Sequence, residues 1–160
     1  MIPAPALEIA VLCWGLILLL AEAFAGKTNR RLLAVAGIAG LAVVLVASFF
    51  LAPPPPASGS GFWSFYTADP LAIFFKRFAI VTTIIVLIMA IDYAPAIQMG
   101  VPGANPHAGL GEFFTLPIFT CAGLMWMASA IDFVMIFVSL ELVTISFYIL
   151  VSYTRRNALS

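Results

Sequence analysis

Residues 133–153, FVMIFVSLELVTISFYILVSY, decide the fold class of this chain. The apolar side chains follow one another without the period-two alternation of a membrane barrel strand, so the run indicates a helix. A helix rises about 1.5 Å per residue and needs about 20 apolar residues to cross a hydrocarbon core about 30 Å thick. The run has that length, and it therefore predicts a transmembrane helix.

The composition of the whole chain also indicates a membrane protein. Of its 160 residues, 64% are hydrophobic and 9% are charged, and the mean hydropathy is +1.15. Soluble proteins average about 45–50% apolar and about 25% charged residues. A water-soluble domain of this size would lack the polar surface to cover its exterior. The composition therefore excludes a soluble globular enzyme, a disordered chain and a disulfide-stapled secreted domain.

Four other apolar runs of similar length lie earlier in the chain than residues 133–153, at residues 7–24, 32–51, 71–91 and 113–130. We therefore predict an all-α fold, a polytopic transmembrane helix bundle with five spans. Its organisation divides into three N-terminal transmembrane helices in residues 1–93, a loop at 94–110 and a transmembrane helical hairpin at 111–156. The hairpin should be tight, because Ile131 and Asp132 are almost all that separates its two runs.

The basic residues predict how the bundle crosses the membrane. Three of the seven lie in residues 27–31, between the first two spans, and two more lie at 155–156, after the fifth span. An external N-terminus places these five on the cytoplasmic side, as the positive-inside rule expects. We therefore expect an N-out, C-in arrangement with a cytoplasmic loop at 94–110. Seven acidic residues balance the basic ones, so the chain lacks the clustered basic surface that nucleic-acid binding requires.

Lys76 and Arg77 oppose this arrangement, since they lie near the outer end of the third span. Their side chains are long enough to snorkel outward to the interface. The alternative is that Lys76 pairs with an acid on a neighbouring helix, and Glu141 is one candidate. Glu8 and Glu22 lie near the two ends of the first span, where we expect both to reach an interface.

Glu141 is the acid that the sequence places nearest the membrane centre. It follows Asp132 by nine residues, or roughly 13 Å at the helical rise. Inserting a charged side chain at that depth costs at least about 2.5–3.5 kcal/mol, so we expect Glu141 to have a structural or functional role there. Helical periodicity puts Thr144 and Tyr148 on or near the same face, and we expect this face to look into a bundle or a hydrated path.

Two interpretations of Glu141 stay open. It is a proton-relay carboxylate, with Lys76, Thr144 and Tyr148 as further candidate site residues, or it is a buried polar group that hydrogen-bonds a neighbouring helix for packing. We expect no metal or cofactor site. His107 has no companion ligand in its loop, and the two cysteines fall inside apolar runs. The sequence holds no haem ligand pair, iron–sulfur cysteine set or nucleotide loop, so we expect no redox chemistry in this polypeptide.

Short motifs in the last third of the chain resemble one family. They are, in order, GEFF (111–114), MASAIDF (127–133), SLEL (139–142), YILV (148–151) and RR (155–156). In this order and spacing the chain resembles subunit N of bacterial NADH-quinone oxidoreductase (respiratory complex I), an antiporter-like membrane subunit. Asp69-Pro70 leading into Phe74-Phe75-Lys76 also looks like the start of that family's third helix.

The resemblance implies a membrane subunit of a proton-translocating NADH-quinone oxidoreductase, a translocase of the bacterial inner membrane. In that family a carboxylate on the fifth helix, which Glu141 matches, pairs with lysines on later helices. The resemblance also implies that NADH, FMN, iron–sulfur clusters and quinone are bound elsewhere in the complex. Its partners would be the lipid bilayer, other membrane subunits and the remaining helices of the antiporter-like fold.

The lysine-bearing helices of the family do not occur in this sequence. We therefore expect a fragment or a split subunit, holding an N-terminal five-helix portion that cannot move protons alone. Two alternatives remain from the sequence. The chain could be a subunit of a multisubunit cation/proton antiporter, or a non-catalytic scaffold bundle in which Glu141 is satisfied by packing.

Overall fold

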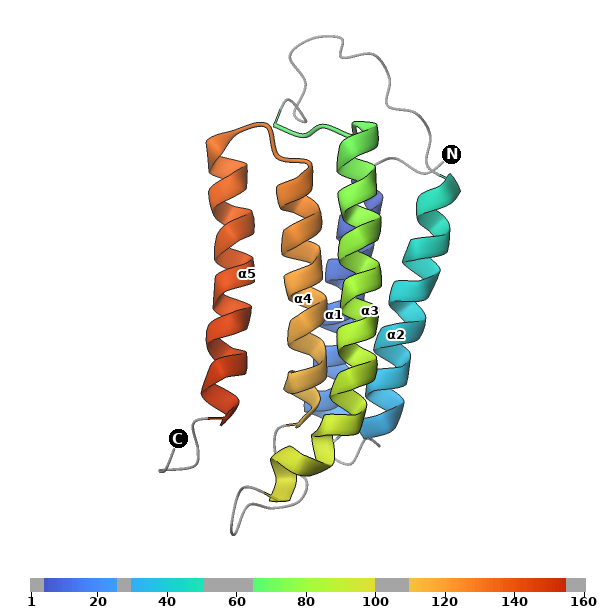
Figure 1. The fold of residues 1–160 in the computed structure, drawn as a ribbon, viewed down its shortest axis with the longest axis vertical. Coiled ribbons are helices and arrows are strands. Elements are labelled where there is room, and N and C mark those ends of the chain that lie inside the picture. The colour runs from blue at the N-terminus through green and yellow to red at the C-terminus, as the bar shows by residue number, and fades with distance from the viewer. Residues whose placement is uncertain (1–4, 26–29, 51–64, 100–109, 155–160) are drawn as a thin grey trace.

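The computed structural model describes residues 5–25, 30–50, 65–99 and 110–154. In these ranges the chain forms five helices that run up and down beside one another (Figure 1). Their bounds are α1 (Ala6–Ala25), α2 (Arg30–Ala47), α3 (Pro70–Met99), α4 (Leu110–Ala128) and α5 (Phe133–Thr154), with a short 3-10 turn, η1 (Ser48–Phe50), after α2. The predicted all-α bundle is confirmed.

The five helices correspond to the five predicted spans. Four are long and apolar enough to cross a membrane, and α4 contributes a shorter apolar stretch at Phe113–Ala128. The chain is therefore a multi-pass membrane protein. One boundary differs, because α3 continues to Met99 and occupies the first part of the predicted loop at 94–110.

Polar residues mark the starts of α3 and α5. Pro70 is the first residue of α3, where its missing N–H costs no hydrogen bond, and the Asp69 carbonyl accepts the Ile73 N–H at 3.0 Å. Asp132 precedes α5, and its carboxylate accepts the Val134 N–H at 3.4 Å. The Asp132 side chain thus caps α5, whereas the Asp69 side chain accepts a hydrogen bond from Thr67 Oγ1 at 2.8 Å in the segment before α3.

α4 lies at the centre of the bundle and packs against α1, α3 and α5 (Figure 1). The core around it consists of large apolar side chains that are fully buried, among them Val11, Leu41, Ile80, Leu87, Ile118 and Met125. α5 differs from the others, because its one extensive contact within the described residues is with α4. It lies at the edge of the bundle.

Small residues let α5 approach α4 closely. A Cβ added at Gly123 would lie 2.8 Å from Val143 Cγ2 and 3.1 Å from the Ser139 carbonyl oxygen. Ser139 and Ser146 are both buried on this side of α5, and each hydroxyl donates to a carbonyl one turn earlier in its own helix. Close contact between small residues is how membrane helices associate, because lipid supplies no hydrophobic driving force between them.

The up-and-down order places the start of α2 and the end of α5 at the same end of the bundle (Figure 1). The N-out, C-in prediction requires this arrangement of residues 27–31 and 155–156. The second of these segments lies outside the described residues, as do residues 26–29. Which side of the membrane this end faces stays a prediction.

Candidate functional site

A buried ion pair joins α1 to α3. Glu8 lies in the first turn of α1 and Lys76 in the second turn of α3, and both helices begin at the same end of the bundle (Figure 1). Lys76 Nζ lies 2.7 Å from Glu8 Oε1, and the two side chains are 1% and 0% exposed. Glu8 Oε2 is buried without a hydrogen-bond partner among the described residues. The ion pair is thus sealed inside the protein.

Tyr66 completes this cluster from the segment that precedes α3. Its hydroxyl accepts a hydrogen bond from Lys76 Nζ at 2.7 Å and donates one to Glu8 Oε1 at 2.9 Å. Burial, followed by the negative charge of Glu8, raises the pKa of the Tyr66 hydroxyl above its ordinary value. The hydroxyl therefore stays protonated and keeps its role as donor to the carboxylate.

The backbone on either side of Tyr66 pairs with the turn between α4 and α5. Tyr66 and Ala130 form an antiparallel β-bridge. The Thr67 N–H donates to the Ser129 carbonyl at 2.8 Å, and the Ile131 N–H donates to the Phe65 carbonyl at 3.0 Å. The segment that carries Tyr66 therefore connects the buried ion pair to the turn from which α5 starts.

These contacts correct two predictions. Lys76 does not snorkel outward. It pairs with an acid on a neighbouring helix, as the alternative prediction expects, but the acid is Glu8 on α1 and not the candidate Glu141. Glu8 does not reach an interface, although it lies at the start of its helix, because α3 and the Tyr66 segment cover it. The sequence carried one signal of this site: an acid in the first span and a base in the third lie near ends that an up-and-down bundle brings together.

Arg77, the next residue along α3, serves a different element. Its Nε donates to Ser48 Oγ at 3.1 Å, and its Nη2 donates to the Ser48 carbonyl at 2.9 Å. The guanidinium also lies 4.2 Å from the centre of the Phe49 ring. Arg77 thus satisfies a carbonyl at the end of α2, as basic residues commonly do at helix C-termini.

Glu141, unlike Glu8 and Lys76, lies on an exposed surface of the bundle. It is exposed on the side of α5 that turns away from α4, together with Val134, Phe137 and Tyr148. Among the described helices this face turns outward, because α5 uses its Ser139 and Ser146 side to pack on α4. That the face looks into a bundle or a hydrated path stays a prediction. The described residues provide the Glu141 carboxylate with no ion pair.

The two hydroxyl candidates on this face are placed differently. Thr144 Oγ1 donates to the carbonyls of Leu140 and Glu141, at 2.9 and 3.1 Å, so its proton is used within its own helix. Tyr148 is 75% exposed and lies two turns from Glu141, about 10 Å along the helix axis. Neither hydroxyl contacts the carboxylate, although Tyr148 shares its exposed face.

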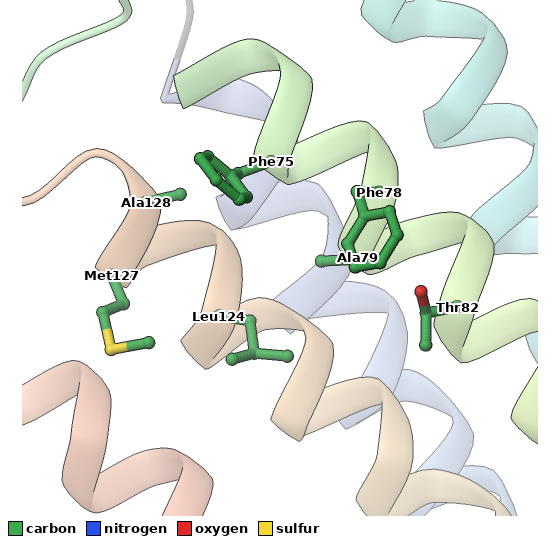
Figure 2. Close-up of a pocket in the computed structure, with 7 residues that line it drawn as sticks. All are labelled: Phe75, Phe78, Ala79, Thr82, Leu124, Met127 and Ala128. Carbon is green, nitrogen blue, oxygen red and sulfur yellow. The ribbon is translucent and has the colours of Figure 1, made fainter. Parts of the chain in front are cut away.

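An apolar groove of about 330 Å³ lies between α3 and α4 (Figure 2). Its lining residues are Phe75, Phe78, Ala79, Thr82, Leu124, Met127 and Ala128. Thr82 is the one polar residue among them, so the groove presents no charged group that could carry chemistry. Among the described residues no group of three or more His, Cys, Asp or Glu side chains could hold a metal ion. His107 lies outside the described residues.

No protein-family model matches the chain. Individual proteins do. Subunit N of NADH-quinone oxidoreductase from Heliobacterium modesticaldum is 35% identical over 127 residues, which are 79% of this chain and 24% of that protein. NADH-quinone oxidoreductase subunit N 2 from Aquifex aeolicus is 33% identical over 151 residues, 94% of this chain and 28% of that protein.

By sequence, the chain is a homologue of subunit N of NADH-quinone oxidoreductase. NAD(P)H-quinone oxidoreductase subunit 2 from Nostoc punctiforme extends the similarity, with 32% identity over 140 residues, 87% of this chain and 24% of that protein. The chain spans about a quarter of the length of these three relatives. The resemblance read from the motifs between residues 111 and 156 is thus confirmed.

Proposed function

We propose that this chain forms part of a membrane subunit of a proton-translocating NADH-quinone oxidoreductase, with Glu141 as its mid-membrane proton carrier. The observation that carries the proposal is an acid exposed about 12 Å along a membrane helix, on the face that the described helices leave open. The names of the subunit N relatives support the choice of complex. The bacterial inner membrane is the location that this role requires.

The free-energy cost of placing a charge in the membrane supports this role for Glu141. A carboxylate facing lipid at this depth would be expensive, so intramembrane acids face a bundle interior or a hydrated cavity. We infer that another membrane helix of the assembled protein covers the Glu141 face of α5. Its side chains would supply a basic partner, because Lys76 is already paired with Glu8 at 2.7 Å. A carboxylate beside a movable base can gain and lose a proton as their separation changes.

The proposal assigns no electron transfer to this chain. NADH, FMN, iron–sulfur clusters and quinone would be bound by other subunits of the complex, and those subunits would be its partners together with the lipid bilayer. Tyr148 would extend the polar face of α5 beyond Glu141. Thr144, whose hydroxyl bonds to its own helix, would shape the face without carrying a proton.

The test is Glu141→Gln in the assembled complex, with NADH-driven acidification of membrane vesicles as the readout. Proton-transfer groups contribute about 10²–10⁴-fold to the steps they serve, so we expect coupled proton transport to fall by about tenfold or more. The matched control is Asp132→Asn, which alters an exposed acid at the start of the same helix and retains a capping side chain. The control should pump normally.

Other outcomes separate the alternatives. Normal proton transport by the Glu141→Gln complex would contradict the proposal. Sodium-dependent transport without NADH-linked activity would indicate a cation/proton antiporter. Unchanged transport by Glu141→Leu would indicate a scaffold bundle, because an apolar residue can replace a packing partner but not a proton carrier.

A further inference from the structure

The cluster of Glu8, Tyr66 and Lys76 has a geometry that packing alone does not require. Each of its three polar groups bonds to the other two, at 2.7, 2.7 and 2.9 Å, in a closed triangle. Lys76 Nζ also lies 4.7 Å from the centre of the Tyr66 ring. Such a triangle is directional. It fixes where the Tyr66 side chain stands relative to α1 and α3, whereas apolar contacts tolerate sliding.

The backbone carries this fixed position to the turn between α4 and α5. Tyr66 is bracketed by the two hydrogen bonds to Ser129 and Ile131 described above, and its ring packs edge-on against Trp126 near the end of α4, with centroids 6.0 Å apart. Helix α5 begins at Phe133, two residues after the second of these bonds. The start of α5 is thus tied to α1 and α3 through one tyrosine.

α5 gains from such an anchor because all of its extensive packing within the described residues is with a single helix. Within the described residues it packs extensively on α4 alone, and that contact is made by small side chains around Gly123. Successive residues on a helix are about 100° apart, so a register change of one residue turns the Glu141 face to a different neighbour. A restraint at the first turn of α5 removes this freedom.

We propose that Glu8, Tyr66 and Lys76 are positioning residues that set the depth and rotation of α5 in the membrane. The consequence for proton transport rests on the proposed function of Glu141; the positioning itself does not. The competing explanation is that the ion pair contributes stability alone. That explanation is weakened by chemistry, since buried ion pairs can often be replaced by apolar residues at no cost, and here Glu8 Oε2 has no hydrogen-bond partner within the described part of the chain.

The experiment measures the position of α5 directly. Spin labels are placed on cysteines at Phe133, the exposed first residue of α5, and at Leu16, an exposed residue of α1. The native exposed cysteine is removed by Cys13→Ser. The distance between the labels is measured by pulsed electron paramagnetic resonance in the full protein, within its assembled membrane complex. It is compared among the unaltered triad, Tyr66→Phe, and the double variant Glu8→Met with Lys76→Met.

We expect the single narrow distance of the unaltered triad to be shifted or split in Tyr66→Phe, which removes one oxygen atom. The same change is expected in the double variant, which removes both charges and leaves none unpaired. The control, Arg77→Gln, removes the adjacent base that bonds to Ser48, and it should leave the distance unchanged. A role in stability alone would lower the yield of assembled protein while the folded molecules kept the original distance.

An unchanged distance in Tyr66→Phe would overturn the proposal, and this variant decides the matter even if the double variant fails to assemble. Proton transport in the same samples separates this result from the proposed function. Displaced labels together with reduced transport support both proposals. Displaced labels with normal transport would overturn the link to Glu141 and leave the positioning role in place.

Discussion

Glu8 and Glu141 are both glutamates on apolar helices, yet the structure treats them in opposite ways. Glu8 is 0% exposed, forms an ion pair with Lys76 and accepts a hydrogen bond from the Tyr66 hydroxyl. Glu141 is exposed on the outer face of the peripheral helix, and the described residues offer it no cation. The difference teaches that an acid on an apolar helix is enclosed or left open according to which side of its helix packs: Glu8 is enclosed with a base, and Glu141 is exposed.

The largest effect should come from breaking the buried pair on one side. Lys76→Met leaves the Glu8 charge inside the core with no cation beside it, and removing one member of a buried pair costs about 3–5 kcal/mol. We expect a much lower melting temperature for the purified protein. The double variant Glu8→Met with Lys76→Met should recover most of this loss, since neither charge remains. A single variant as stable as the parent would show that the pair does not restrain the bundle.

Tyr66→Phe should have an intermediate effect. It deletes the hydroxyl that bonds both members of the ion pair and keeps the ring against Trp126. Hydrogen bonds to charged groups contribute about 1.5–3 kcal/mol, and the free energy of unfolding should fall by about that amount. Denaturant titration in mixed micelles measures the change. A decrease in the free energy of unfolding as large as that of Lys76→Met would mean that the Tyr66 hydroxyl, and not the ion pair, stabilises the cluster.

Gly123→Val tests the contact between α4 and α5, the peripheral helix that carries Glu141. The new side chain would collide with Val143 Cγ2 and the Ser139 carbonyl, and neither can withdraw without moving α5. Overpacking of this kind costs about 1–3 kcal/mol. We expect α5 to separate from α4, seen as faster proteolysis near residue 131, while the contacts of α1 with α3 persist. Equal destabilisation of all five helices would argue against a peripheral α5.

The smallest effect on stability should be that of Glu141→Gln. The described helices give its carboxylate no partner, and substitutions at such positions stay within about 0.5 kcal/mol. The melting temperature of the purified chain should therefore be unchanged, whereas proton transport by the assembled complex that carries the same substitution should fall. A large fall in melting temperature would show that Glu141, like Glu8, contributes to the stability of the fold.

Much of the fold could be predicted from the sequence, because the lipid bilayer restricts which secondary structures can cross it. In a bilayer each backbone polar group must bond within its own helix, so apolar runs of sufficient length predict helices with near-correct ends. Asp69-Pro70 and Asp132 mark two helix starts for equally local reasons. The helical end of α3 was not predicted, because the Pro, Gly, Asn and His residues of the 94–110 segment are typical of a loop and Pro95 disfavours a helix interior, yet α3 continues to Met99.

The site was predicted less well, because pairing depends on which faces meet. Helical periodicity correctly grouped Glu141 with Tyr148 on one face of α5, but it could not say whether that face turns toward α4. The residues opposite decide this: Gly123 admits Ser139 and Val143, and so the Glu141 face points outward. For the same reason, the sequence predicted that Lys76 could pair with an acid on a neighbouring helix but not which acid, and it offered Glu141 where the structure has Glu8.

Membrane insertion, the number of helices, their order and the chain's kinship to subunit N were determined by sequence alone, since apolar length and motif spacing are properties of the linear chain. The tertiary structure decided the partners. It brought Glu8 and Lys76 together across 68 positions of sequence, linked them through Tyr66 to the turn before α5, and left Glu141 facing outward. Ion pairs depend on distances of a few ångströms between side chains, and those distances exist only after the helices have packed.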